Sequence, residues 1–175
     1  MALRFIRAAA LYRGPLKAAI HALKYEGLPL LGRLLARYLI AATDTEEWDR
    51  VLNSIHAIVP IPLHPARRAE RGYNQSELLA VAFADAKDLV VEPSWLTRRR
   101  HTQSQTTLSR QERRLNVAGA FQADPSVRNR RILLVDDVYT TGATMEACAQ
   151  ALLDAGAEAV YGLALAMPPF QEEPA

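Results

Sequence analysis

The sequence predicts an α/β fold in which helices cover both faces of a mainly parallel central sheet. Short apolar runs at 55–61, 131–135 and 159–166 alternate with segments whose apolar residues recur at the helical period. That alternation is typical of parallel sheets with helical crossovers. The chain has 175 residues and 50% of them are hydrophobic, so we expect a single domain with a sizeable core.

The N-terminal part, 1–50, is predicted to be helical. One helix opens at Gly14-Pro15 and closes before Gly27 and Pro29. A second helix follows with apolar residues at helical spacing: Leu31, Leu34, Leu35, Tyr38 and Leu39. We expect the apolar face of this small helical part either to cover a site as a hood or to contact a second subunit. A homodimer is therefore one of the two alternatives.

Residues 51–167 are predicted to form the α/β core and 168–175 a tail. Beside the three apolar runs, 89–91 and 117–121 are expected to be a short strand and an edge strand. Asn74 can cap a helix with Glu77 at the capping-box spacing. The segment 63–73 has no apolar period and is predicted to be a loop. The polar segment 98–115 is long for a connection inside a compact domain, which favours a lid or a binding loop.

Charge and cysteine content narrow the functional classes. Residues 98–131 hold nine arginines against Glu112 and Asp124, so this stretch is either a solvated face or binds a polyanion such as a phosphorylated metabolite or nucleic acid. Cys148 is the only cysteine, which excludes an intramolecular disulfide and a cysteine zinc cluster. No apolar run approaches the ~20 residues of a membrane span, and arginines interrupt the start, so we expect a cytoplasmic protein without membrane partners.

The most informative stretch begins where the run 131–135 ends. Asp136 and Asp137 are adjacent carboxylates at the end of a buried strand, where they need partners such as sugar hydroxyls or a divalent metal. A turn of hydroxyl and small residues follows, and it can cradle a phosphate at the start of the next helix: Thr140, Thr141, Gly142, Ala143 and Thr144. A ribose site beside a phosphate site is more specific than either alone.

With these residues in view, the sequence resembles a known family. The run Val135-Asp-Asp-Val-Tyr-Thr-Thr-Gly-Ala-Thr144 is similar to the phosphoribosyl-pyrophosphate (PRPP) signature of type I phosphoribosyltransferases. The run Val59-Pro-Ile-Pro-Leu-His-Pro-Ala-Arg-Arg-Ala-Glu-Arg-Gly-Tyr-Asn-Gln75 resembles the ComF/GntX group within them. The short run Leu23-Lys-Tyr25 is a further match, and the resemblance covers roughly 12–166. It implies a type I phosphoribosyltransferase-like fold.

The resemblance also implies roles for single residues. Asp136 and Asp137 are expected to hold the ribose 2′- and 3′-hydroxyls, and 140–144 the 5′-phosphate. The expected pyrophosphate residues are Arg67, Arg71, Tyr73 and Asn74, with Arg68 equally well a surface charge. Arg98, Thr102 and Gln105 are expected to contact ligand from a flexible loop. Mg²⁺ is the implied cofactor, bridging ligand oxygens with few protein ligands, of which Asp136 and Asp137 are candidates.

The resemblance leaves the nitrogenous acceptor unidentified. Thr140 stands where transferases for 6-oxopurines generally carry an acid, and threonine is a poor general base, so such acceptors are disfavoured. His64, His101 and Tyr139 could each approach a base. ComF-like proteins are also expected to carry an N-terminal cysteine cluster for zinc, which Cys148 alone cannot form.

Three functions therefore stay open. The first is a phosphoribosyltransferase that joins PRPP to a small nitrogenous acceptor. The second is a non-catalytic sensor of PRPP or nucleotide, and the third is a competence factor that contacts nucleic acid through 98–131.

Overall fold

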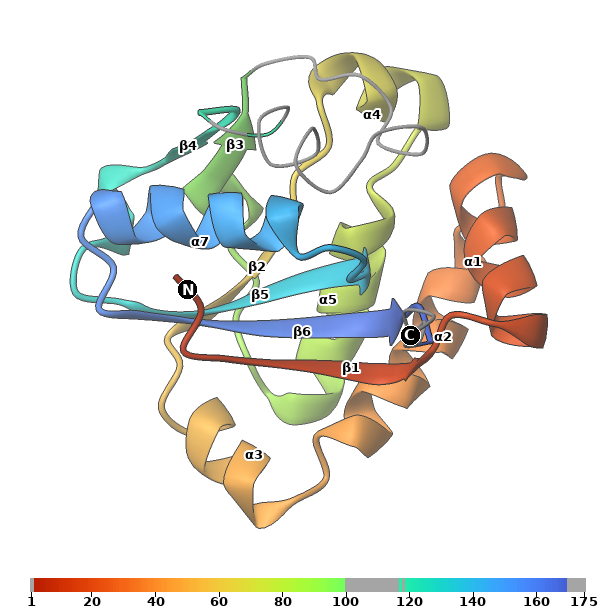
Figure 1. Cartoon of the computed structure of the whole chain (residues 1–175), viewed down its shortest axis with the longest axis horizontal. Coiled ribbons are helices and arrows are strands. Elements are labelled where there is room, and N and C mark those ends of the chain that lie inside the picture. The colour runs from red at the N-terminus through yellow and green to blue at the C-terminus, as the bar shows by residue number, and fades with distance from the viewer. Residues whose placement is uncertain (1, 100–116, 118, 170–175) are drawn as a thin grey trace, which may run out of the picture.

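The computed structural model describes residues 2–99, 117 and 119–169. Within these residues, a four-stranded sheet of parallel strands has the order β1-β6-β5-β2 (Figure 1). Its strands are β1 (Phe5–Leu11), β2 (Ala57–Pro60), β5 (Arg131–Val138) and β6 (Ala159–Met167). A separate antiparallel pair joins β3 (Leu96–Arg98) to β4 (Phe121–Ala123). The predicted parallel sheet is confirmed, with β5 in its interior.

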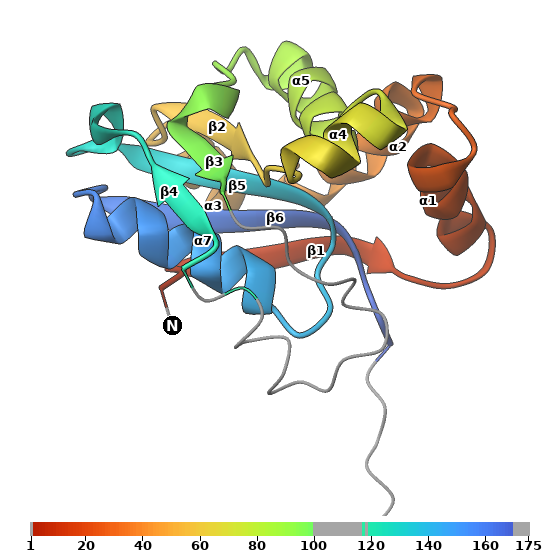
Figure 2. The same cartoon turned by 90° about the horizontal axis from the view of Figure 1, so that it is seen from above.

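Helices lie on both faces of this sheet (Figure 2). On one face pack α2 (Leu30–Ala42), α3 (Glu46–Leu52) and α5 (Gln75–Lys87), in a core that includes Leu133 of β5. On the other face α7 (Ala143–Asp154) packs in a core that includes Ile132 and Leu134. Since successive strand residues point to opposite faces, the apolar run of β5 is buried on both sides. No helix of the described residues has the length and apolar character needed to cross a membrane.

The N-terminal part contains the two predicted helices, α1 (Gly14–Tyr25) and α2, but the prediction that 1–50 is helical is wrong at its start. Phe5–Leu11 forms β1, an edge strand paired with β6 from Phe5↔Tyr161 to Leu11↔Met167. Three consecutive alanines and Arg7 give this run little intrinsic strand character. Tertiary pairing with the buried strand β6 therefore decides its conformation.

The second predicted helix buries a different stripe from the one expected. Leu35 and Leu39 of α2 are buried, whereas Leu34 and Tyr38 are 54% and 49% exposed. The small residues Gly32 and Ala36 take part in the buried face instead. They let α2 approach α5 closely.

The segment 63–73, predicted to be a loop, contains the short helix α4 (Pro65–Arg71). None of its residues is buried, which is why it shows no apolar period. Its ends are set by local signals, since the His64 ring accepts a hydrogen bond from the Ala66 N–H at 3.3 Å and Gly72 closes the helix at φ +83°.

Two predicted strands are shorter than expected. The predicted edge strand at 117–121 begins only at Phe121, as β4, and the strand at 89–91 is reduced to one bridge between Val91 and Ile58. Single 3₁₀ turns, Pro93–Trp95 and Pro125–Val127, flank β3 and β4.

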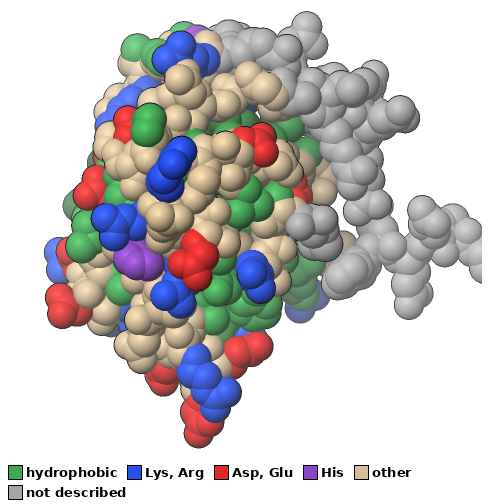
Figure 3. Space-filling view, turned by 90° about the vertical axis from the view of Figure 1, so that its left-hand side faces the viewer, with side chains coloured by type: hydrophobic (Ala, Val, Ile, Leu, Met, Phe, Trp, Pro, Cys, Tyr) green, Lys and Arg blue, Asp and Glu red, His purple; other side chains and the backbone are tan. Residues whose placement is uncertain are grey.

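The strands of the sheet begin at one end of the molecule and finish at the other, and the two ends have different surroundings. The strands begin at the end of the molecule that faces the viewer in Figure 3, where basic and acidic side chains are interspersed. The ion pair of Arg131 with Glu158, at 3.5 Å, belongs to the start of β5 and the turn before β6. The strands finish at the opposite end, close to α1 and the turn that leads from β5 into α7 (Figure 1).

Close packing of α2 on α5 makes a prediction about Gly32. A Cβ at this position would lie 2.7 Å from the Leu78 Cβ. Glycine to alanine normally stabilises a helix interior, but here Gly32→Ala should destabilise the protein by about 1–3 kcal/mol through overpacking. Urea unfolding measures the effect. Arg33→Ala, at the exposed neighbouring position, is the control, and a Gly32→Ala protein more stable than wild type would refute the packing argument.

Candidate functional site

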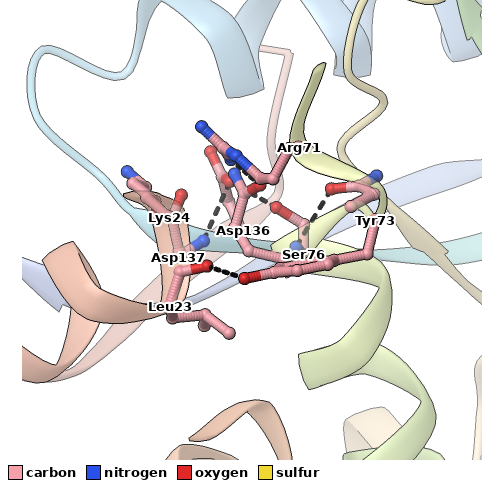
Figure 4. A network of polar contacts seen from close by, with 9 residues as sticks. Leu23, Lys24, Arg71, Tyr73, Ser76, Asp136 and Asp137 are labelled. Carbon is pink, nitrogen blue, oxygen red and sulfur yellow. Dashed lines mark hydrogen bonds and ion pairs between the residues drawn. The ribbon is translucent and has the colours of Figure 1, made fainter. Parts of the chain in front are cut away.

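The acid pair lies at the carboxyl end of β5, as predicted (Figure 4). Asp136 Oδ1 accepts hydrogen bonds from the Ser76 hydroxyl at 2.9 Å and from the Asp137 N–H at 2.8 Å. Asp137 is only 4% exposed, and its carboxylate forms an ion pair with the ammonium of Lys24 from α1. The two carboxylates therefore have different partners, neutral donors for one and a cation for the other.

These partners shift the pKa values of the two carboxyl groups in opposite directions. Burial, followed by repulsion from Asp137, raises the pKa of Asp136 to about 8. Burial also acts to raise the pKa of Asp137, but the Lys24 ammonium and hydrogen bonds outweigh it and hold that pKa below the usual range. Burial acts to lower the pKa of Lys24, and attraction to Asp137 overcomes it, so the pKa of Lys24 is raised. Near neutral pH the pair thus has one protonated and one ionised carboxyl group.

The start of α5 holds the pair in place. Ser76 donates to Asp136, and the side chain of Gln75 forms a hydrogen bond with Asp137 that helps to lower its pKa. Asn74 caps the helix by accepting from the Ser76 N–H at 3.1 Å, and its amide donates to the Ile61 carbonyl at 3.0 Å. Asn74 is thus confirmed as the predicted cap, while Glu77 forms an ion pair with Arg68. Asn74 also anchors the helix to the end of β2.

The motif Arg71-Gly-Tyr-Asn-Gln75 acquires a physical meaning from these contacts. Arg71 donates a hydrogen bond to the Gln75 side chain, and its guanidinium lies 5.4 Å from the centre of the Tyr25 ring. Gly72 supplies the left-handed turn between α4 and α5. The Tyr73 hydroxyl donates to the Leu23 carbonyl at 2.5 Å. Within this motif Gln75 contacts the acid pair directly, and Arg71 and Tyr73 connect the same segment to α1.

The predicted phosphate turn occupies the start of α7. Gly142 has φ +77° and is the N-cap residue, so the free N–H groups of a twelve-residue helix begin here. The Thr141 hydroxyl accepts from the Ala143 N–H at 3.4 Å. A Cβ on Gly142 would lie 2.7 Å from Cζ of Tyr139, so that ring would have to shift, and the positive φ by itself favours glycine here. Thr140 and Thr144 lie in the same turn and have polar contacts of their own.

A groove of about 1000 Å³ extends from the phosphate turn along α7 towards β4. Its lining includes Tyr139, Thr141 and Gly142 at the turn, and Phe121 and Gln122 from β4. The acid pair is not part of this lining, so the groove adjoins the predicted phosphate turn and not the acids.

Arg98 is the one predicted loop residue that the described part of the chain contains. Burial, assisted by the nearby charge of Arg67, lowers the pKa of Arg98, while the Cys148 thiol and Asp136 act in the opposite direction. Its guanidinium lies 5.4 Å from the centre of the Phe121 ring. The electrostatic influence of both Arg67 and Asp136 places Arg98 close to the acid pair and to α4.

Other predicted residues are placed as follows. Thr102, Gln105 and His101 lie outside the described residues. Arg68, left open between ligand contact and surface charge, forms an ion pair with Glu77 at 2.9 Å. The His64 ring caps α4.

Three further residues belong to the site and were not predicted from the sequence: Lys24, Gln75 and Ser76. A lysine on an amphipathic helix normally indicates a solvated face. The available signal was the match of Leu23-Lys-Tyr25 to the family, taken together with the need of two adjacent carboxylates for a cation.

The described residues fit only a magnesium ion that brings most of its own ligands. They contain no group of three or more His, Cys, Asp or Glu side chains able to hold a metal. The acid pair offers two carboxylates, and Asp137 is already paired with Lys24. Mg²⁺ keeps several waters and binds through one or two carboxylates and ligand phosphates, so the pair fits an ion held mainly by a bound pyrophosphate.

Several known proteins are similar in sequence to this chain. A family model described as phosphoribosyl transferase domain matches residues 79–173. Competence protein F of Haemophilus influenzae is 36% identical over 160 residues, which are 89% of this chain and 70% of that protein. DNA utilization protein YhgH of Escherichia coli is 35% identical over 149 residues, 85% of this chain and 66% of that protein. The chain thus spans about two thirds of the length of these curated relatives.

One solved structure supports the fold. The allosteric regulatory enzyme of purine biosynthesis matches with a TM-score of 0.50 at 20% identity, over 77% of this chain and 25% of that chain. At this identity the likeness concerns the fold alone, and it confirms the predicted fold class.

The acid pair should make the stability of the free protein depend on pH. The folded Asp136 has a pKa of about 8 against 3.8 for an ordinary aspartate, so the folded state keeps a proton that the unfolded chain releases between these values. Stability is therefore lost as the pH rises through this window. Of the other shifted groups, Asp124 and Asp137 have pKa values below this window, and Lys24 and Cys148 have pKa values above it.

Melting temperatures measured from about pH 5 to pH 9 test this. The wild type should lose stability across the range, and Asp136→Asn, which cannot ionise, should flatten the curve. Asp85→Asn, at an exposed position of α5, should follow the wild type. Equal pH slopes for wild type and Asp136→Asn would rule out the assigned proton.

Proposed function

Because the chain belongs to the phosphoribosyltransferase family that includes competence protein F, we propose that it binds PRPP and transfers the phosphoribosyl group to a nitrogenous acceptor. The observation that carries the proposal is the joining of two subsites at the end of one strand. Asp136 and Asp137 end β5, and the phosphate turn that opens α7 follows within a few residues. Their order and spacing match a ribose that carries a 5′-phosphate.

The acid pair would bind the ribose in a polarised way. The ionised Asp137 accepts a hydrogen bond from one hydroxyl, and the protonated Asp136 is able to donate one to the other. The 5′-phosphate would lie at the N-terminus of α7, where free N–H groups and the positive end of the helix dipole favour an anion. Together these contacts fix the ribose ring relative to the protein.

The basic residues near the acid pair would receive the pyrophosphate. Arg67 and Arg71 of α4 and Arg98 of β3 gather at this end of the sheet. In the reaction the bond from C1 of the ribose to pyrophosphate breaks, a bond from C1 to the acceptor nitrogen forms, and that nitrogen loses a proton. The arginines would stabilise the leaving group as its negative charge grows. Bound Mg²⁺ would neutralise part of the same charge.

The acceptor is the open part of this proposal. Thr140 occupies the position at which an acid would manage the proton of a 6-oxopurine, so we propose a different nitrogenous acceptor. A non-catalytic PRPP sensor would use the same donor subsites and would differ only in releasing no pyrophosphate.

A second candidate function is contact with nucleic acid. It is suggested by the name of the relative YhgH, DNA utilization protein, and by α4, which carries Arg67, Arg68 and Arg71 and has no buried residue. Arginines on an exposed helix can contact phosphates without regard to sequence. DNA binding that weakens steeply with salt and persists in Asp136→Asn/Asp137→Asn would support this function.

Ligand-dependent stability tests the donor site. PRPP with Mg²⁺ at 100 times its Kd should add about 2.7 kcal/mol of stability and raise the melting temperature. Asp136→Asn/Asp137→Asn should lose that increase, because the ribose hydroxyls lose the charged acceptor Asp137 and the hydroxyl donor of protonated Asp136. Asp85→Asn is the matched surface control. Absence of any shift in the wild type would eliminate both the transferase and the sensor.

A screen of nucleobases and small amines separates the transferase from the sensor. The transferase predicts pyrophosphate release that requires PRPP, Mg²⁺ and one acceptor class, and that Asp136→Asn/Asp137→Asn abolishes. A protein that binds PRPP but releases no pyrophosphate with any acceptor would be a sensor.

A further inference from the structure

Three consecutive residues at the end of α1 contact the candidate site, each in a different way. The Leu23 carbonyl accepts a hydrogen bond from the Tyr73 hydroxyl at 2.5 Å, and Lys24 pairs with Asp137 (Figure 4). The Tyr25 ring lies 5.4 Å from the Arg71 guanidinium. The last turn of α1 is thereby attached to β5 and to the segment between α4 and α5. The position of α1 and the geometry of the acid pair are consequently linked.

Lys24 makes the only one of these contacts that reaches a ribose-facing acid directly. Its side chain is 22% exposed and that of Asp137 is 5% exposed, so the ion pair is largely shielded from water. Removing one partner of such a pair leaves an uncompensated buried charge. Without Lys24 the buried Asp137 carboxylate would lack a cationic partner and would no longer be held in its present position.

The other partners of the acids cannot replace Lys24. Ser76 and Gln75 are neutral donors on α5, and they fix the direction of a carboxylate without offsetting its charge. Arg98 is another cation near Asp136, but Asp136 is the smallest of the influences on the pKa of Arg98, and the charged groups that shift the pKa of Asp136 are Asp137 and Lys24. Among the described residues, Lys24 is the cation that the structure pairs with the acids.

We propose that Lys24 is a positioning residue of the donor site, which holds the Asp137 carboxylate for a ribose hydroxyl and makes donor affinity depend on the seating of α1. This inference rests on the proposed PRPP-binding function. It assigns to the N-terminal helix a direct part in binding the sugar donor. Lys24 acts through Asp137, so its effect should disappear when Asp137 is already neutral.

Calorimetric Kd values for PRPP with Mg²⁺ test the proposal in a set of variants. Lys24→Met should weaken binding about tenfold or more, equivalent to about 1.4 kcal/mol. Lys24→Arg, which keeps the charge, should stay within about threefold of wild type. Lys17→Met is the matched control, because Lys17 is exposed two turns earlier on the same helix, about 10 Å away, and it should bind as wild type.

The double variant separates positioning from general stability. Lys24→Met/Asp137→Asn should bind no more weakly than Asp137→Asn alone, because Lys24 has no carboxylate left to hold. A merely structural role would give losses that multiply. Should Lys24→Met fail to fold, Lys24→Gln replaces it, since its amide can still donate to Asp137 while the charge is lost.

The outcomes keep the two proposals apart. If the wild type binds PRPP and Lys24→Met binds equally well while Asp137→Asn does not, the role of Lys24 is refuted and the donor site stands. Multiplying losses in the double variant refute the role of Lys24 in the same way. If the wild type does not bind PRPP, the proposed function is lost and the role of Lys24 with it.

Discussion

Two adjacent carboxylates at the end of a buried strand impose the constraint on which the rest of this site depends. β5 lies between β6 and β2 and is covered by helices on both faces, so its carboxyl end is far from bulk water on most sides. Ionised groups in such surroundings are unfavourable unless charges and hydrogen bonds compensate them. Two features provide this compensation. Asp136 stays protonated at pH values below its pKa of about 8, and Asp137 is paired with the Lys24 ammonium.

That compensation comes from elements far apart in the chain. α1 supplies Lys24, the start of α5 supplies Gln75 and Ser76, and β3 brings Arg98 near Asp136. The tight turn at Gly142 then starts α7 directly after the acids. Because the acids need these partners, the end of α1 and the segment between α4 and α5 lie at the same end of the sheet as the acids.

The sequence predicted the features that depend on local pattern. Leu133 and Leu134 lie in an apolar run that could only be a buried strand, and Asn74 is a recognisable helix cap. The position of the acid pair and the turn after it were predicted from the same kind of local pattern. β1 could not be predicted, because its alanines become a strand through pairing with β6. Helix α4 buries nothing, so no periodicity marked it.

Lys24 shows why the site could be predicted only in part. Its spacing on α1 is that of a surface lysine, and its partner is Asp137, more than a hundred positions later in the chain. A pattern among neighbouring residues cannot reveal a contact between positions so far apart in the chain. In the same way, Leu34 and Tyr38 fit the helical period of α2 but are exposed, because the close approach of Gly32 to α5 decides which stripe is buried.

A crystal structure of the protein with PRPP and Mg²⁺ tests the central claim most directly. The account predicts ribose hydroxyls within hydrogen-bond distance of Asp136 and Asp137, Lys24 still paired with Asp137, and the 5′-phosphate at the N-terminus of α7. A ligand bound elsewhere, or bound at the acid pair with Lys24 turned away into solvent, would contradict it.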